Sequence, residues 1–372
     1  MEKLLEELKV KSLYRERRLR EDLLDFCSND YLALKDHPEV VEEAIRALKE
    51  IGLGSGASQL VSGYTKYHMD LEEALADFKG VPRCVLFGSG YLANLSLANL
   101  VGEEDLILSD ELNHASLIDG CRLSKAKVFI FKHRDYQHLE ELLKKHRRNY
   151  RRCLIVSDSV FSMDGDIAHI PTLKGLAKAY DCMLYLDEAH ATGVLGQEGR
   201  GSLEEFKENW EDYMIIMGTL SKAIGSYGAF VCGSEVLCQY LVNKARSLIF
   251  STSLPPPVCA GAKRALEIIK ENPSMVAKLR DLSRKIYEKI ARIGLEVSFH
   301  GTSIIPIMVY REERAINIRE RLLEKGIFLQ AIRYPTVPLG KARLRLTASL
   351  RYKQEDIESL TEALKEAITY TA

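Results

Sequence analysis

Between residues 66 and 250, short apolar runs alternate with segments of helical length, and this alternation limits the folds open to the chain. Apolar runs without polar alternation suit strands buried on both faces, and helix-length connections suit parallel neighbours. The sequence therefore predicts an α/β domain with a mainly parallel seven-stranded sheet, covered by helices on both faces. The seven predicted strands are Cys84–Phe87, Leu106–Leu108, Val128–Phe131, Cys153–Val156, Met183–Leu186, Met214–Met217 and Ala229–Cys232.

The order of predicted helices and strands changes after residue 250. Helical spacing runs through Lys270, Asn272-Pro273 breaks it, and a further helical stretch reaches Ile293. Strand-like and helical segments then mix, as in a small α+β unit, with predicted strands at 295–299, 304–310, 327–331 and 342–347. Helical spacing also marks residues 4–19 and 40–51. We therefore predict an N-terminal segment (1–44) that packs with the small domain, a large domain (45–275) and a small domain (276–372).

The charge balance excludes some classes of partner. With 52 Lys+Arg against 53 Asp+Glu, the net charge is 52 − 53 = −1, which argues against a nucleic-acid-binding protein. The basic run 144–152 follows a helical stretch and is interpreted as a solvated helix end. No apolar run approaches the roughly 18 residues that cross a bilayer, so we expect a cytoplasmic protein without a membrane partner. The 8 Cys lack a CxxC pair and are interpreted as small buried hydrophobic residues.

Three of the predicted strand ends stand out as candidates for a ligand site. Ligands of open α/β sheets bind at the carboxyl ends of strands, so polar residues there are the first candidates for a site. Asp187 ends one strand, and an acid there is expected to face a cation. Lys222 follows another among small residues, and the turn from Gly88 to Tyr91 opens a helix after a third, as phosphate-binding turns do.

Taken together, a lysine, an acid and a phosphate-binding turn suit pyridoxal 5′-phosphate (PLP). The lysine can bind the aldehyde, the acid can keep the pyridine nitrogen protonated, and the turn can take the phosphate. Singly, each feature has a common structural explanation: a strand-end Asp is often a cap, and a lone Lys is usually a surface residue. Only the combination points to this cofactor.

Competing motifs are incomplete. The DEAH sequence at 187–190 lacks the upstream GxxxxGK[ST] loop that nucleotide-driven helicases need. HExxH and GxSxG are absent, so a zinc hydrolase or an α/β-hydrolase has no support, and we expect no metal. The glycines at 54–56 follow a helical stretch and do not complete the dinucleotide motif GxGxxG.

With these motifs, the sequence resembles the α-oxoamine synthases, which are PLP enzymes of fold type I. The resemblance implies an aspartate-aminotransferase-like fold and the condensation of an amino acid with an acyl thioester. It covers nearly the whole chain. The residues that carry it are Phe26–Leu32, Gly54–Ser58, Ser89–Asn94, Asn113–Ser116, Val160–Gly165, Asp187–His190, Gly218–Lys222 and Ser251–Pro255.

The resemblance also implies roles for single residues. Lys222 matches the Schiff-base lysine, Asp187 the partner of the ring nitrogen, and His190 the partner of the ring hydroxyl oxygen. His114 matches the histidine stacked on the ring, although without the resemblance it would be interpreted as a buried core residue. Thr252 matches a residue that reaches the neighbouring subunit's phosphate site, which implies a homodimer with shared active sites. Further matches at the cofactor are Gly90, Tyr91, Ser162 and Thr219.

Within the family, the stretches 331–338 and 342–346 look most like members that join L-alanine to a pimeloyl thioester in biotin synthesis. Arg345 then matches the arginine that holds the amino-acid carboxylate, while Asn29 and Arg15 fall at substrate-side positions. Coenzyme A and an acyl carrier protein both stay open as carriers of the thioester. The alternatives are condensation of glycine with acetyl-CoA, and a non-catalytic subunit of a heteromeric synthase. One departure is Asp158, where many relatives have Glu.

Overall fold

The computed structural model describes residues 1–10, 13–15, 17, 19 and 21–369, and the chain divides into two compact units. The sheet unit comprises Leu32–Ser162 and Ile167–Ala277. The small unit comprises Met1–Tyr31, Met163–Asp166 and Lys278–Ala372. The domain boundaries expected after residues 44 and 275 stay a prediction, because a compact unit need not be a domain that folds alone.

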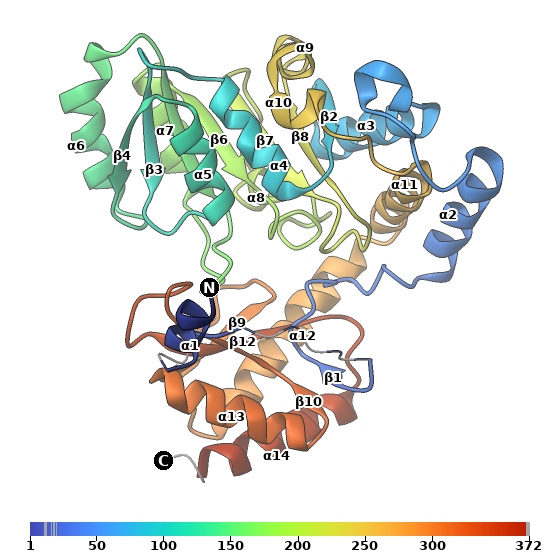
Figure 1. Cartoon of the computed structure of the whole chain (residues 1–372), viewed down its shortest axis with the longest axis vertical. Helices are drawn as coiled ribbons and strands as arrows, with labels where there is room; N and C mark the ends of the chain where they lie inside the picture. Colours follow the sequence, from blue (N-terminus) through green and yellow to red (C-terminus); the bar gives the residue numbers. More distant parts are fainter. Residues whose placement is uncertain (11–12, 16, 18, 20, 370–372) are drawn as a thin grey trace. The chain divides into compact units, whose positions relative to one another are not determined.

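The sheet unit contains the seven strands that the sequence predicts (Figure 1). Their order is β2-β8-β7-β6-β5-β3-β4, and β8 is antiparallel to both of its neighbours while the other pairs are parallel. The mainly parallel seven-stranded sheet is therefore confirmed. The strands are β2 (Arg83–Phe87), β3 (Leu106–Asp110), β4 (Lys127–Phe131), β5 (Cys153–Asp158), β6 (Met183–Asp187), β7 (Met214–Thr219) and β8 (Ala229–Gly233).

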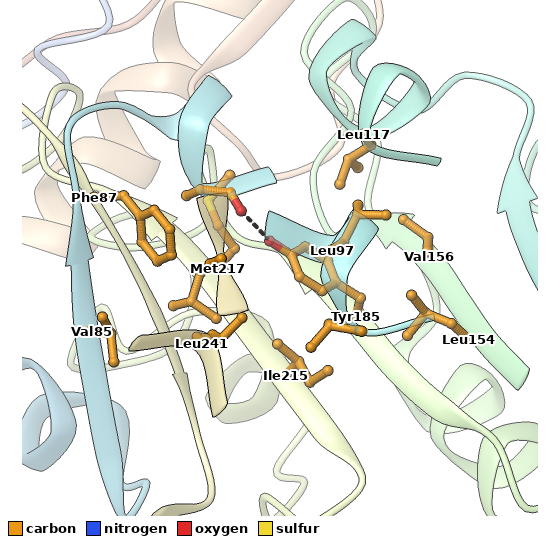
Figure 2. Packing of buried hydrophobic residues seen from close by; sticks show 14 of the residues in the cluster. Val85, Phe87, Leu97, Leu117, Leu154, Val156, Tyr185, Ile215, Met217 and Leu241 are labelled. Atoms are coloured by element: carbon orange, nitrogen blue, oxygen red, sulfur yellow. Dashed lines mark hydrogen bonds between the residues drawn. The ribbon is translucent and has the colours of Figure 1, made fainter. Parts of the chain in front are cut away.

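Both faces of the sheet are buried, which explains why the strand sequences do not alternate with polar residues. One face carries Val85, Val156, Tyr185 and Ile215, packed on α4, α5, α9 and α10 (Figure 2). The residues next to them in sequence point to the opposite face and are equally buried. The packed helices are α4 (Gly90–Leu95), α5 (Ala115–Leu123), α9 (Glu235–Lys244) and α10 (Arg246–Ile249).

The remaining helices of this unit follow the sequence expectation closely. The helix predicted at 40–51 is α2, Pro38–Ile51, which packs on α11. The stretch through Lys270 is α11, Pro256–Glu271, which also packs on α3. The others are α3 (Lys66–Lys79), α6 (Tyr136–His146), α7 (Ile170–Ala179), α8 (Ser202–Glu205), η1 (Gln59–Gly63), η2 (Ser96–Asn99) and η3 (Arg147–Asn149).

The small unit has a three-stranded antiparallel sheet in the order β11-β12-β9, and a parallel pair, β1-β10. Its strands are β1 (Leu24–Asp25), β9 (Ile304–Tyr310), β10 (Ile327–Phe328), β11 (Gln330–Ile332) and β12 (Ala342–Thr347). The helices are α1 (Glu2–Val10), α13 (Glu312–Glu324) and α14 (Gln354–Thr369), while α12 (Ser274–Arg292) begins in the sheet unit.

Three local predictions were wrong. The helix expected at 4–19 ends at Val10, since α1 buries no side chain and short unpacked helices are marginal; part of residues 11–20 lies outside the described chain. The strand expected at 295–299 is a single bridge between Val297 and Ile307. The strand expected at 327–331 is divided into β10 and β11, which pair with different partners.

Two other expectations were only partly right. Cys84 and Cys232 face each other across β2 and β8 and form a disulfide, a pairing 148 residues apart that sequence spacing does not reveal. The basic run 144–152 includes the solvated end of α6, where Lys144 and Lys145 are exposed, but two of its arginines have structural partners. Arg147 donates to the carbonyl oxygens of Tyr180 and Asp181, and Arg152 pairs with the buried Asp105. Within the described residues, no helix is both long and apolar enough to cross a bilayer.

A buried ion pair joins the end of α3 to the segment after β6. The side chains of Lys79 and Glu188 are each 2% exposed and are bonded to each other. Lys79 Nζ also donates to Thr192 Oγ1 at 3.0 Å, and Glu188 Oε1 accepts from the Ser202 backbone N–H at 2.8 Å. Glu188, the second residue of the DEAH sequence, is therefore a structural residue.

Replacing Lys79 with Met is expected to lower the free energy of unfolding by about 3–5 kcal/mol, because Glu188 is left as an unpaired buried charge. Urea denaturation measures the loss. Lys178→Met is the matched control, since Lys178 is 67% exposed in its pair with Glu211 and its loss should barely move the midpoint. Equal effects of the two substitutions would contradict the assigned role of the buried pair.

Candidate active site

Four neighbouring parallel strands end at one edge of the large sheet, and each is followed by a residue of the candidate site. The strands are adjacent in the order β7-β6-β5-β3, so their carboxyl ends lie side by side. Lys222 follows β7, Asp187 ends β6, Asp158 ends β5, and His114 follows β3. The sheet therefore brings a lysine, two carboxylates and a histidine to the same edge.

Asp187 is fixed by hydrogen bonds at both carboxylate oxygens. Its Oδ2 accepts from Asn94 Nδ2 at 2.7 Å, and its Oδ1 accepts from the Ala189 backbone N–H at 2.8 Å. The residue is 3% exposed. A carboxylate with N–H donors on both oxygens is held in one orientation, as a hydrogen-bond acceptor.

Asp158 lies directly opposite Asp187 in the parallel register of β5 and β6. Its Oδ2 accepts from the His114 backbone N–H at 2.6 Å. Burial and the neighbouring charge of Asp187 raise the pKa of Asp158 well above its usual range, while the His114 N–H and the charge of Lys222 oppose this shift. Asp158 therefore keeps its proton to a higher pH than an ordinary aspartate does.

His114 is the N-cap residue of α5. Its Nδ1 accepts from the Ser116 backbone N–H at 3.2 Å and lies 2.7 Å from Ser116 Oγ. Desolvation by the surrounding protein lowers the pKa of His114; the charge of Asp187 opposes this, and that of Lys222 adds to it. The imidazole is therefore neutral near pH 7.

Lys222 and His190 lie on the loops that follow β7 and β6. Lys222 is half-buried, and its charge acts on both His114 and Asp158. His190 is buried, three residues beyond Asp187. The residues predicted to surround a cofactor ring thus all come from adjacent loops at one edge of the sheet.

The predicted phosphate-side residues include two that lie together. A Cβ atom added to Gly90 would lie 4.0 Å from Thr219 Cβ, so the turn after β2 adjoins the end of β7. Thr219 is buried and donates to the Gly228 carbonyl oxygen at 2.9 Å. Tyr91 is exposed, and its hydroxyl bonds to Asp119.

The remaining predicted cofactor residues are Ser162 and Thr252. Ser162 is half-buried and ends the first segment of the sheet unit. Thr252 is exposed and pairs with Ser58 in an isolated antiparallel bridge. The bridge joins the 251–255 motif to the glycine-rich loop at 54–58, which are far apart in sequence.

The predicted substrate-side residues lie in the small unit. Arg345 on β12 is buried, and its Nη1 donates to Asn29 Oδ1 at 3.2 Å. Asn29 Oδ1 also accepts from the Tyr31 hydroxyl at 3.1 Å. Burial raises the pKa of Tyr31 to about 12, against the lowering effect of Arg345. Arg15 is exposed and donates instead to Thr336 Oγ1 at 3.3 Å.

Four residues of the site were missed by the sequence analysis: Asn94, Ser116, Tyr185 and Asp158, of which Asp158 was named only as a departure from the family pattern. Asn94 and Ser116 were visible only as letters within the motifs SGYLAN and NHAS, and Tyr185 as an apolar residue of a strand. Asn94 is a polar residue in an otherwise apolar helical turn, and such a residue needs a buried partner. That requirement was the signal that could have found it.

Replacing Asp158 with Asn tests its raised pKa. The stability that Asp158 contributes is fully present below its unfolded-state pKa of about 3.9 and is lost as pH rises toward the higher folded-state pKa. We therefore expect Asp158→Asn to gain stability relative to the unmodified protein as pH rises from about 5 to 8, measured by urea denaturation. Asp181→Asn, at a fully exposed side chain, is the control. A stability difference that stays constant with pH for Asp158→Asn would contradict the assignment.

The chain is similar to known protein sequences over nearly its whole length. A family model described as aminotransferase class I and II matches residues 21–364. A protein of Aquifex aeolicus is 61% identical over 369 residues, covering 99% of this chain and 98% of its own. It carries the name 8-amino-7-oxononanoate synthase as a provisional assignment.

Solved structures agree with the sequence comparison. A serine palmitoyltransferase from S. paucimobilis, solved with bound PLP and myriocin, superposes with a TM-score of 0.92 at 25% identity, over 99% of this chain and 96% of that chain. The crystal structure of 8-amino-7-oxononanoate synthase from Francisella tularensis superposes with a TM-score of 0.79 at 29% identity. It covers 94% of this chain and 99% of that chain.

Proposed function

Because this chain belongs to the class I and II aminotransferases and, within them, to the PLP-dependent α-oxoamine synthases, we propose that it condenses L-alanine with a pimeloyl thioester. The products are 8-amino-7-oxononanoate, carbon dioxide and the free thiol, so the reaction supplies a precursor of biotin. The observation that carries the proposal is the set of His114, Asp158, Asp187 and Lys222 at four adjacent strand ends. Acyl thioesters are intracellular metabolites, which supports a cytoplasmic location.

The residues fit PLP. Gly90 leaves open a space beside Thr219 that a side chain would fill, and Asp187 offers a buried, fixed acceptor. We propose that Lys222 Nζ bonds the aldehyde carbon and that Asp187 accepts from the protonated ring nitrogen. The other residues proposed to hold the cofactor are Gly90, Tyr91 and Thr219 at the phosphate, His114 and Ser162 at the ring, His190 at the ring hydroxyl, and Thr252 from a second subunit.

Bound PLP supplies an aldehyde that captures amines and a ring that accepts electrons from the amino-acid α-carbon. The amino group of L-alanine would displace Lys222 from the aldehyde, and the freed Lys222 amine is the proposed base for the α-proton, since Lys222 follows β7 near the other site residues. His114 is neutral because its pKa is lowered, so its ring can lie against an aromatic cofactor without adding a second cation beside Lys222.

Arg345 is the proposed site for the carboxylate of L-alanine. A guanidinium binds a carboxylate through two parallel N–H donors, and Asn29 Oδ1 holds one of its nitrogens at 3.2 Å. Because Asn29 also accepts from the buried Tyr31 hydroxyl, the fork is held in one orientation. Arg15 is proposed as a second substrate-side cation, supported only by its match to the family pattern.

Thiol release measures the reaction and separates the candidate substrates. Purified protein with PLP is expected to release thiol faster from pimeloyl-CoA plus L-alanine than from acetyl-CoA plus glycine, with the ketone product identified by mass. A pimeloyl carrier protein in a parallel assay tests the second carrier. Faster release with acetyl-CoA plus glycine would overturn the substrate proposal and keep the reaction class.

Two variants test the roles of single residues in this assay. Lys222→Ala should abolish turnover, while Arg345→Ala should raise the KM for L-alanine and leave PLP binding unchanged. Retention of the site residues argues against a non-catalytic subunit. A wild-type protein that binds no PLP and releases no thiol would revive that alternative.

We also propose a homodimer. The side of α2 away from α11 exposes an apolar stripe at helical spacing, with Val41, Ile45, Leu48 and Ile51 each 39–44% exposed. Contiguous apolar surface of this kind marks an interface, and Thr252 at the surface suits a contribution to a second subunit's site. A second copy of this chain is the proposed partner.

Light scattering after size-exclusion chromatography tests the dimer. The expected mass is twice 42.0 kDa, and Ile45→Glu should shift the protein toward a single chain because a charge then enters the apolar interface. Lys49→Glu, an exposed position on the same helix, is the control. A wild-type protein that elutes as one chain would contradict the proposal.

A further inference from the structure

Asn94 lies at the centre of a buried hydrogen-bond network beneath the candidate site. The residue is 1% exposed and belongs to α4, directly after the glycine turn. Its Nδ2 donates to Asp187 Oδ2 at 2.7 Å and to Ser116 Oγ at 2.8 Å. Its Oδ1 accepts from the Tyr185 hydroxyl at 3.0 Å. Both N–H donors and the carbonyl of the amide are therefore used.

The Tyr185 hydroxyl sets the orientation of this amide. Tyr185 lies on β6 and points toward α4, where the Ala93 carbonyl oxygen is also 3.5 Å away (Figure 2). Burial raises the pKa of Tyr185 well above its usual range, so the hydroxyl keeps its proton and can donate to Asn94 Oδ1. A reversed amide would turn its oxygen toward the Asp187 carboxylate, two acceptors without a proton between them.

The second N–H of Asn94 acts on the tautomer of His114 through Ser116. Ser116 Oγ accepts from Asn94, so its own proton is free to point to His114 Nδ1, 2.7 Å away. The Ser116 backbone N–H also donates to Nδ1. With two donors at Nδ1, the neutral imidazole carries its proton on Nε2. The donors thus run in one direction, from Tyr185 through Asn94 and Ser116 to His114.

We propose that Asn94 is a positioning residue that holds the Asp187 carboxylate and the His114 tautomer together, in the arrangement that the bound cofactor requires. The proposal rests on the proposed function, because Asp187 and His114 are assigned there to the ring nitrogen and the ring face. The described bonds of the Asn94 side chain are to Asp187, Ser116 and Tyr185. Asn94 acts by donating one N–H to each arm of the site.

The test compares Asn94→Ala with Ser96→Ala. Ser96 lies two residues further along, is also buried, and donates to the Ala93 carbonyl oxygen and not to Asn94, Asp187 or Ser116. Removing the N–H donor to Asp187 should shift the pH midpoint of the absorption change of bound PLP by about one unit or more. It should also lower kcat by about tenfold or more, with little change in the KM for L-alanine. Ser96→Ala should leave the midpoint and kcat close to those of the wild type.

Tyr185→Phe and Ser116→Ala keep the test decisive if Asn94→Ala fails to fold. Tyr185→Phe removes only the hydroxyl that orients the amide, and should shift the PLP midpoint in the same direction by a smaller amount. Ser116→Ala removes only the arm to His114, and should lower kcat with a smaller shift of the midpoint than Asn94→Ala. Unchanged absorption titrations in both Asn94→Ala and Tyr185→Phe would overturn the proposal.

The spectroscopic measurement is independent of the substrate assignment. If the wild type binds PLP but releases no thiol from either substrate pair, the proposed function fails while the absorption titration still tests Asn94. If thiol is released and Asn94→Ala titrates like Ser96→Ala, the role of Asn94 fails and the proposed function stands.

Discussion

The carboxyl groups of Asp158 and Asp187 are buried side by side, and this burial is the constraint that the hydrogen bonds of the rest of the site must satisfy. Parallel pairing of β5 and β6 puts them in register, where two ionised acids would repel each other across a medium of low polarity. The two carboxyl groups have different hydrogen-bond partners, which reduces this repulsion. Asp187 receives N–H donors on both oxygens, while Asp158 accepts one backbone N–H and has a raised pKa. Helix α4, the loop after β6 and the N-cap of α5 supply those donors.

Strand pattern predicted much of the fold. The seven apolar runs became seven strands because a sheet buried on both faces leaves no place for polar residues within it. The sequence predicted less where elements lack a packed face, as with α1, or where pairing depends on distant segments. The disulfide between Cys84 and Cys232 is of the second kind, since β2 and β8 become neighbours only when the sheet assembles.

The candidate site likewise contains residues that the sequence could predict and residues that it could not. The position of Lys222, Asp187 and the turn at Gly90 at strand ends could be predicted from the order of apolar runs, and strand ends are where open α/β sheets bind ligands. Asn94 and Tyr185 could not be assigned a role from spacing, because a hydrogen bond between α4 and β6 depends on how a helix packs on a sheet. The roles of Ser162, Thr252 and Arg15 stay predictions, since the bridge from Thr252 to Ser58 and the bond from Arg15 to Thr336 do not indicate a ligand.

The small unit draws on three separate pieces of the chain, and one of them is only four residues long, Met163–Asp166. That piece is bonded within the unit: Asp164 pairs with Arg343 on β12, and the Gly165 carbonyl oxygen accepts from Thr302 Oγ1 at 2.8 Å. The backbone therefore passes between the two units four times, at 31–32, 162–163, 166–167 and 277–278. No single cut can separate them into two intact polypeptides. In evolutionary terms, simple fusion at one end of the chain could not have added or exchanged the small unit as a whole.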